Sequence, residues 1–270
     1  MTRTFRNALA AAAALATLAG AAQAQAQTQA PAAKAATQPV RNIVLVHGAF
    51  ADGSGWRGVY DELTARGYRV SIVQNPLTSL ADDVAATKRV LQRQDGPAIL
   101  VGHSYGGTVI TEAGSDPKVA GLVYVAALAP DAGESTGDQF AEIPAPPGFV
   151  IEPQADGFGF VNLQKFKSGF AGDVSDADAA FMRDSQVPIA MSAFTDKVTH
   201  AAWRTKPSWF VVATEDGAID PKLLRKTAGR IGAEAHEIKG SHVVFLSRPK
   251  AVADVIDRAA QGAARKTPQG

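Results

Sequence analysis

A serine with a glycine two positions away on each side is the feature of this chain most suggestive of chemistry: Gly102-His103-Ser104-Tyr105-Gly106. An apolar run at 98–101 precedes it, and a helix-compatible stretch at 107–115 follows. Where a strand turns so sharply into a helix, the two backbones approach too closely for side chains at the flanking positions, so glycine is expected there. The turn would hold the serine hydroxyl out above the sheet edge. Ser104 is therefore the candidate nucleophile.

A serine hydroxyl attacks a carbonyl only if a base accepts its proton, and the chain offers five histidines. His242 lies in a loop between the last expected strand and the final helix, where a side chain can reach back over the sheet edge. His103 adjoins the serine but should point elsewhere by strand alternation. The remaining three lie at the end of the first strand, in a long insertion and within the last strand: His47, His200 and His236. We therefore expect His242 to be the base.

The carboxylate that orients this histidine should follow the penultimate strand, where the chain reads Thr214-Glu215-Asp216-Gly217. Asp216 is the preferred acid, because its neighbour Glu215 should point to the opposite side. Asp220 already has a sufficient role as a helix cap before Pro221. The resulting order of nucleophile, acid and histidine along the chain is the one that follows a serine on such a turn.

Attack on a carbonyl creates an oxyanion, which needs hydrogen-bond donors already in place. The backbone N–H of Tyr105, directly after the serine, is one candidate donor. The chain also turns sharply after the first strand at His47-Gly48-Ala49-Phe50, where Gly48 leaves room for the turn. The N–H of Ala49 is the best second donor, with that of Phe50 as the fallback.

The elements that must position these residues alternate between strand and helix. Continuous apolar runs, typical of parallel strands buried on both faces, occur at 42–46, 68–73, 98–101, 119–125, 209–213 and 235–238. Helical patterns occupy 56–66, 80–93, 108–115, 221–231 and 249–260. Ser79 is positioned to cap the second of these helices. The alternation predicts an α/β fold, a three-layer sandwich around a mostly parallel sheet.

One long segment, at about 131–206, interrupts the alternation. It is rich in Gly, Pro and Asp and contains eight phenylalanines but no strand-like run. We expect it to form a small helical cap, inserted before the penultimate strand and packed over the strand ends where the serine emerges. Most of its phenylalanines should form the core of the cap, and the others could line a pocket.

The two ends of the chain differ in composition from this domain. Arg3 and Arg6 precede an uncharged run at 8–22, and Ala22-Gln23-Ala24 has the small residues of a cleavage site. This pattern predicts a signal peptide at 1–24 and export, secreted or periplasmic, with no membrane anchor after cleavage. A disordered leader should follow at 25–39, then the domain at 40–262, and a disordered tail at 263–270.

Charge and cysteine content narrow the class of protein further. Loss of Arg3 and Arg6 with the signal peptide takes the formal net charge from +1 to −1, and no basic patch for nucleic acid is indicated. There is no cysteine, so disulfides contribute nothing to stability. A domain of this length can bury a core that needs no covalent staple.

Taken together, these motifs resemble the α/β-hydrolase superfamily over residues 41–261. Within it, the chain is similar to small serine esterases related to plant methyl-ester hydrolases and hydroxynitrile lyases, a group that includes pyrethroid-hydrolase-like bacterial proteins. The resemblance implies a Ser-His-Asp triad, no cofactor, a short cap and ester cleavage through an acyl-enzyme. The chain departs from the pattern in two respects: no strand is expected before residue 42, and the export signal is not typical of the cytosolic members.

Three hypotheses about function remain open on the sequence. The first is a hydrolase of small, largely apolar carboxylic esters, with no metal site and no bound cofactor. The second keeps the pocket but makes the enzyme a lyase, a perhydrolase or a cofactor-free haloperoxidase. A lyase would require a basic group from the cap, for which Lys165, Lys167 and Lys197 are candidates. The third is a binding protein that retains the triad as a ligand anchor.

Overall fold

The computed structural model describes residues 40–266. The expected signal peptide at 1–24 and leader at 25–39 lie outside this range, as do residues 267–270. Within the described part of the chain, no helix is both long enough and apolar enough to cross a membrane.

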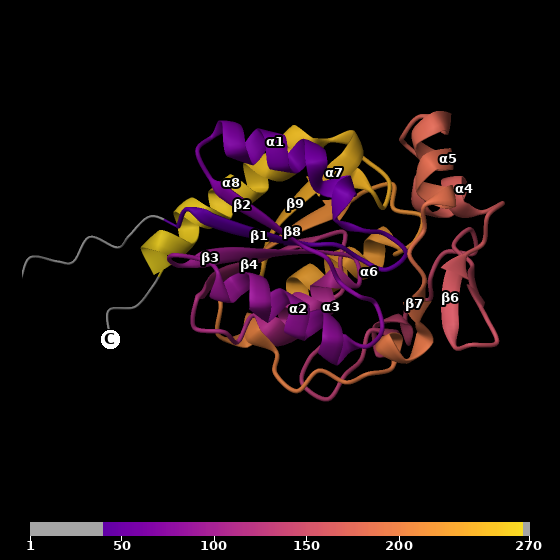
Figure 1. Cartoon of the computed structure of the whole chain (residues 1–270), viewed down its shortest axis with the longest axis horizontal. Helices are drawn as coiled ribbons and strands as arrows, with labels where there is room; N and C mark the ends of the chain where they lie inside the picture. Colours follow the sequence, from indigo (N-terminus) through magenta and orange to yellow (C-terminus); the bar gives the residue numbers. More distant parts are fainter. Residues whose placement is uncertain (1–39, 267–270) are drawn as a thin grey trace, which may run out of the picture. The chain divides into compact units, whose positions relative to one another are not determined.

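A six-stranded sheet forms the centre of the domain, with strand order β2-β1-β3-β4-β8-β9 and parallel pairing throughout (Figure 1). Continuous apolar sequences build its middle, where every residue of β1 (Asn42–Val46), β3 (Ala98–His103) and β8 (Ser208–Ala213) is buried. The remaining strands are β2 (Arg69–Val73), β4 (Val119–Val125) and β9 (Glu234–Ile238). All six strands expected from the sequence are present.

Helices cover both faces of this sheet. The helices α1 (Arg57–Ala65) and α8 (Pro249–Lys266) pack together on one face, and α2 (Leu80–Gln92) and α3 (Gly106–Ala113) on the other (Figure 1). The short helix η1 (Gly53–Trp56) precedes α1, α7 (Val244–Ser247) precedes α8, and α6 (Pro221–Arg230) packs on β8 and β9. The three-layer α/β sandwich is thereby confirmed.

Local signals account for the ends of several helices. The Ser79 hydroxyl accepts a hydrogen bond from the Asp82 N–H, and the Asp220 carboxylate accepts one from the Lys222 N–H, as expected of caps. At the other end of the chain, α8 continues to Lys266 because its buried face extends beyond residue 260 to Ala263. Residues 263–266 are therefore helical, and the prediction of a disordered tail from 263 was wrong for these four.

The cap differs from the expected helical one. It contains α4 (Phe166–Phe170) and α5 (Asp176–Asp184), but also an antiparallel sheet of β5 (Ile151–Pro153), β6 (Phe158–Val161) and β7 (Ile189–Ala190). Short helices η2 (Gly137–Phe140), η3 (Met191–Phe194) and η4 (Ala202–Arg204) complete it. Strands of two to four residues are too short for their periodicity to be recognised in the sequence.

The eight cap phenylalanines also depart from expectation. Only Phe166 and Phe170 are fully buried, and Phe181 is 69% exposed. Five of the eight line the two cavities described below: Phe140, Phe149, Phe170, Phe181 and Phe194. Most cap phenylalanines thus form cavity wall, and the buried apolar residues of the cap are mainly of other types, such as Val161, Ile189 and Val198.

Candidate active site

Ser104 lies on the tight turn between β3 and α3, with a backbone φ of +53°. A Cβ added to Gly102 would collide with the carbonyl oxygen of Gly106. A Cβ on Gly106 would lie 2.7 Å from the carbonyl oxygen of His47. The two flanking glycines are therefore required by the close approach of three backbone segments, and the tight turn that they permit holds Ser104 in the left-handed conformation.

Three side chains far apart in the sequence form one hydrogen-bonded relay. The Ser104 Oγ lies 2.8 Å from His242 Nε2, and His242 Nδ1 lies 2.8 Å from Asp216 Oδ2. The second carboxylate oxygen of Asp216 accepts hydrogen bonds from the N–H groups of Ala218 and Ile219, both at 2.8 Å. A carboxylate acceptor at Nδ1 places the histidine proton there, which leaves Nε2 free to accept the serine proton.

The competing acids occupy other positions. Glu215 is exposed and forms an ion pair of 3.5 Å with Lys239. Asp220 caps α6, as expected. Of the three carboxylates near the end of β8, only Asp216 is directed to the histidine.

Two of the other histidines form exposed pairs with carboxylates. His200 lies 3.2 Å from Glu112, and His236 lies 3.2 Å from Glu234. The remaining two, His47 and His103, are buried beside the relay. Neither of them is assigned a function by its place in the sequence.

His47 fixes the peptide bond before Ala49. The N–H of Asn75 donates to His47 Nε2 at 2.9 Å, so the ring proton is on Nδ1 and donates to the Gly48 carbonyl, also at 2.9 Å. Burial lowers the pKa of His47, which keeps the ring neutral and suited to this arrangement. Since the C=O and N–H of one peptide point in opposite directions, the held Gly48 carbonyl sets the direction of the Ala49 N–H.

The peptide between Ser104 and Tyr105 is held in the same way. The Ser104 carbonyl accepts hydrogen bonds from the Gly107 N–H at 2.9 Å and the Leu128 N–H at 3.3 Å. The Tyr105 N–H therefore points the opposite way. A Cβ on Gly48 would lie 2.8 Å from the Ser104 Cβ, so the loop carrying Ala49 and Phe50 passes directly against the serine.

His103 supports the backbone of the relay histidine. Its Nε2 donates to the carbonyl oxygen of His242 at 2.9 Å, and the two ring centres are 4.7 Å apart. Burial and the neighbouring His242 lower the pKa of His103 well below its ordinary value, so the ring stays neutral. Strand alternation does turn it away from Ser104, but toward the loop that carries His242.

A cap residue also contacts that loop. Asp173, between α4 and α5, accepts hydrogen bonds from the hydroxyls of Ser241 and Ser247. Partial burial opposes ionisation, yet these hydrogen bonds lower the pKa of the Asp173 carboxyl. No local sequence pattern predicts this contact, because Asp173 lies 68 residues from Ser241.

The relay opens into a cavity of about 310 Å³, called here the catalytic cavity. Its walls include Ser104, His242, Ala49, Phe50 and Tyr105, and the cap contributes apolar side chains: Phe140, Phe149, Phe170, Met191 and Phe194. None of the lysines considered for a lyase lines it. Lys167 pairs with Asp176 and Lys197 with Asp138 on the surface. Among residues 40–266, no group of three or more His, Asp or Glu is arranged to hold a metal ion.

A sandwich of this kind, with hydrogen-bonded Ser, His and Asp side chains at its strand ends, is typical of one class of hydrolases. The chain belongs to the α/β hydrolase family, whose model matches residues 43–255.

Comparison with individual proteins agrees with this membership. The chain is 27% identical over 252 residues to a pyrethroid hydrolase from Sphingobium wenxiniae, an alignment that covers 80% of this chain and 86% of that protein. The crystal structure of a pyrethroid hydrolase from Sphingobium faniae matches with a TM-score of 0.69 at 22% identity, covering 84% of this chain and 99% of the other. Polyneuridine aldehyde esterase matches with a TM-score of 0.68 at 18% identity, covering 80% and 98%.

Proposed function

We propose that this carboxylic ester hydrolase cleaves small, largely apolar esters through a covalent acyl-enzyme on Ser104. The observation that carries the proposal is the unbroken relay from Ser104 through His242 to Asp216, with both hydrogen bonds at 2.8 Å, at the wall of an apolar cavity. A relative named a pyrethroid hydrolase supports an ester as the substrate.

In the first half of the reaction, Ser104 Oγ attacks the acyl carbon while its proton passes to His242 Nε2. Asp216 holds the imidazole and stabilises its charged form. The carbonyl oxygen becomes an oxyanion, which the N–H groups of Ala49 and Tyr105 bind. Such donors are worth about 3 kcal/mol each when they are preorganised. His47 holds the Gly48 carbonyl, and this favours Ala49 over Phe50 as the second donor.

The tetrahedral intermediate then breaks its bond to the alcohol oxygen, and that oxygen takes the proton from His242 Nε2. Water replaces the departed alcohol and gives a proton to the same nitrogen as it attacks the acyl carbon. Collapse of the second intermediate releases the acid and returns the proton to Ser104. The chemistry balances with water as the sole co-reactant.

A series of nitrophenyl esters of graded acyl length tests the proposal, with Ser104→Ala as the matched variant. We expect hydrolysis by the wild type, none above background by the variant, and labelling of Ser104 by a fluorophosphonate. Peroxide-dependent turnover without hydrolysis would instead indicate a perhydrolase or haloperoxidase. Tight ligand binding without turnover would indicate a binding protein.

The composition of residues 1–24 also supports a proposal about location, namely that the enzyme is exported and its signal peptide removed. Cell fractionation followed by mass spectrometry of the mature N-terminus tests this. Recovery of the uncleaved chain from the cytoplasm would contradict it.

A further inference from the structure

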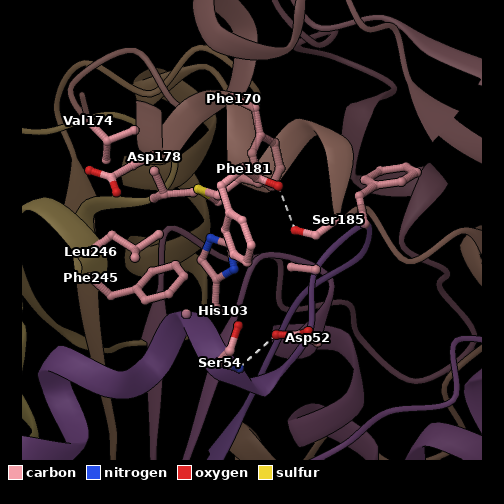
Figure 2. Close-up of a pocket in the computed structure, with 15 residues that line it drawn as sticks. Asp52, Ser54, His103, Phe170, Val174, Asp178, Phe181, Ser185, Phe245 and Leu246 are labelled. Atoms are coloured by element: carbon pink, nitrogen blue, oxygen red, sulfur yellow. Dashed lines mark hydrogen bonds between the residues drawn. The ribbon is translucent and has the colours of Figure 1, made fainter. Parts of the chain in front are cut away.

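A second cavity of about 270 Å³ lies beside the catalytic cavity and contains neither Ser104 nor His242 in its lining. Figure 2 shows it between α5, which carries Phe181 and Met182, and the segment that carries Phe245 and Leu246. Residues before and within η1, Ala51, Asp52, Ser54 and Gly55, also line it. We call this space the side cavity.

Two phenylalanines line both cavities and so form the partition between them: Phe50 and Phe170. The Phe170 ring also packs with its edge against the His242 ring, with the ring centres 4.9 Å apart. The side cavity is further lined by Val243, the residue after the relay histidine, and by His103, which supports it. The side cavity therefore borders the His242 loop, and its opposite wall is formed by Phe50 and Ala51 from the loop after Ala49.

The proton transfers of the proposed mechanism determine which part of an ester must lie next to His242. The alcohol oxygen must lie within hydrogen-bond reach of His242 Nε2 to receive its proton, whereas the carbonyl oxygen is held by the Ala49 and Tyr105 N–H groups. An alcohol group longer than a few atoms must then extend past His242 and its Phe170 neighbour. On this basis, which rests on the proposed function, we propose that the side cavity binds the alcohol portion of the substrate and the catalytic cavity binds the acyl portion.

The lining of the side cavity defines the chemical class of that alcohol. Phe181, Met182 and Phe245 offer apolar and aromatic surface. Two polar groups of the lining already have partners, because the Ser185 hydroxyl donates to the Phe181 carbonyl at 2.7 Å and the Ser54 N–H donates to Asp52 at 2.7 Å. The carboxylates of Asp52 and Asp178 disfavour an anionic group. An uncharged, aromatic alcohol fits this lining best.

Phe181 adds independent support. Its side chain is 69% exposed although it lines the side cavity, so a large apolar ring faces water when nothing is bound. An aromatic alcohol group would cover part of this ring and gain the free energy of burying it. Each cavity by itself is at or just below the lower end of the usual range for ligand sites, about 300–1,000 Å³, and the pair lies within it.

Two isomeric esters separate the two cavities, because they contain the same atoms and differ in which side of the ester carries the ring. Phenylpropyl acetate has its aromatic ring on the alcohol, and ethyl phenylpropanoate has it on the acid. Met182→Trp fills the side cavity, and the matched variant Met191→Trp fills the catalytic cavity. Purified wild type and variants are compared by kcat/KM for both esters, with thermal unfolding as the check on folding.

We expect Met182→Trp to lower kcat/KM for phenylpropyl acetate about tenfold more than for its isomer, and Met191→Trp to show the reverse preference. Phe181→Ala, at an exposed position where folding is not at stake, should raise KM for phenylpropyl acetate selectively. Equal effects of Met182→Trp and Phe181→Ala on the two isomers, or a preference for the wrong isomer, would overturn the assignment of the side cavity. If the wild type shows neither ester hydrolysis nor labelling by a fluorophosphonate, the proposed function itself is refuted.

Discussion

The sheet core and the cap contribute different things to the candidate site. The relay side chains and the proposed oxyanion donors all follow core strands, and hydrogen bonds of 2.8–2.9 Å link and support them. The cap contributes apolar walls and a carboxylate, Asp173, that contacts the His242 loop through Ser241 and Ser247. The comparison implies that the core determines the type of reaction, whereas the cap selects the substrate.

The largest effect should come from removing the core nucleophile. Ser104→Ala should lower kcat for ester hydrolysis by about 10⁴-fold or more, because no other group replaces the attacking oxygen. Initial rates with nitrophenyl esters measure activity, and circular dichroism checks separately that the variant is folded. A variant that keeps a tenth of the wild-type activity would show that the reaction does not use this serine.

The next largest effect should follow loss of the orienting carboxylate. Asp216→Asn should reduce kcat about a thousandfold, since an amide cannot hold the imidazole in the same proton state. Glu215→Gln is the matched control, one residue away and paired only with exposed Lys239. If both variants lose activity equally, Asp216 is not the orienting acid, and the loss reflects disturbance of the whole loop after β8.

A smaller effect tests whether the cap influences chemistry at all. Asp173→Ala removes the acceptor of two serine hydroxyls and should lower kcat about tenfold, with KM less affected, because the His242 loop loses a support. Asp173→Asn should recover part of the loss. Asp176→Ala, at an exposed carboxylate three residues away, is the control.

Two measurements, kcat with its pH profile and thermal stability, distinguish support of His242 by Asp173 from a merely structural role of Asp173. If Asp173→Ala lowers thermal stability but leaves kcat and its pH profile unchanged, the cap contact serves folding alone. The division between core and cap would then be sharper than we propose.

The last prediction concerns stability rather than rate. The Asp83 side chain is buried beneath the site and accepts hydrogen bonds from the Leu77 N–H and the Tyr105 hydroxyl, each at 2.8 Å. Burial raises the pKa of this carboxyl to about 6. Its contribution to stability is therefore fully present below its unfolded pKa of 3.8 and is lost as the pH rises through about 6.

Asp83→Asn removes this titration while keeping the size of the side chain. We expect the variant to gain about 1–3 kcal/mol of stability relative to the wild type between about pH 4 and pH 8, measured by urea unfolding across that range. A difference between the two proteins that stays constant with pH would contradict the assignment of the titration to Asp83.

The sequence predicted the core well because strong local patterns specify it. Asn42 and the four apolar residues that follow it, up to Val46, form a buried strand, and Ser79 and Asp220 cap the helices that they precede. The side chains of Ser104, Asp216 and His242 could also be chosen from the sequence, since each follows a recognisable strand. Their catalytic roles remain a prediction.

The cap was predicted less well because its structure depends on contacts between distant segments. The three-residue strand β5 exists only by pairing with β6, which no local pattern indicates. Phe170 and Phe181 have the same side chain, yet one is buried against His242 and the other is 69% exposed. Residue type by itself could not assign one to a core and the other to a cavity mouth.

The sequence by itself determined the sheet, its flanking helices and the choice of the three side chains proposed for catalysis, because hydrophobic periodicity and glycine at a crowded turn are local properties. Only the tertiary structure decided that His47 would orient the Ala49 peptide, that His103 would hold the His242 backbone, and that Phe50 and Phe170 would divide two cavities. Each of these depends on directions and distances between segments far apart in the chain, which are established only when the core has packed.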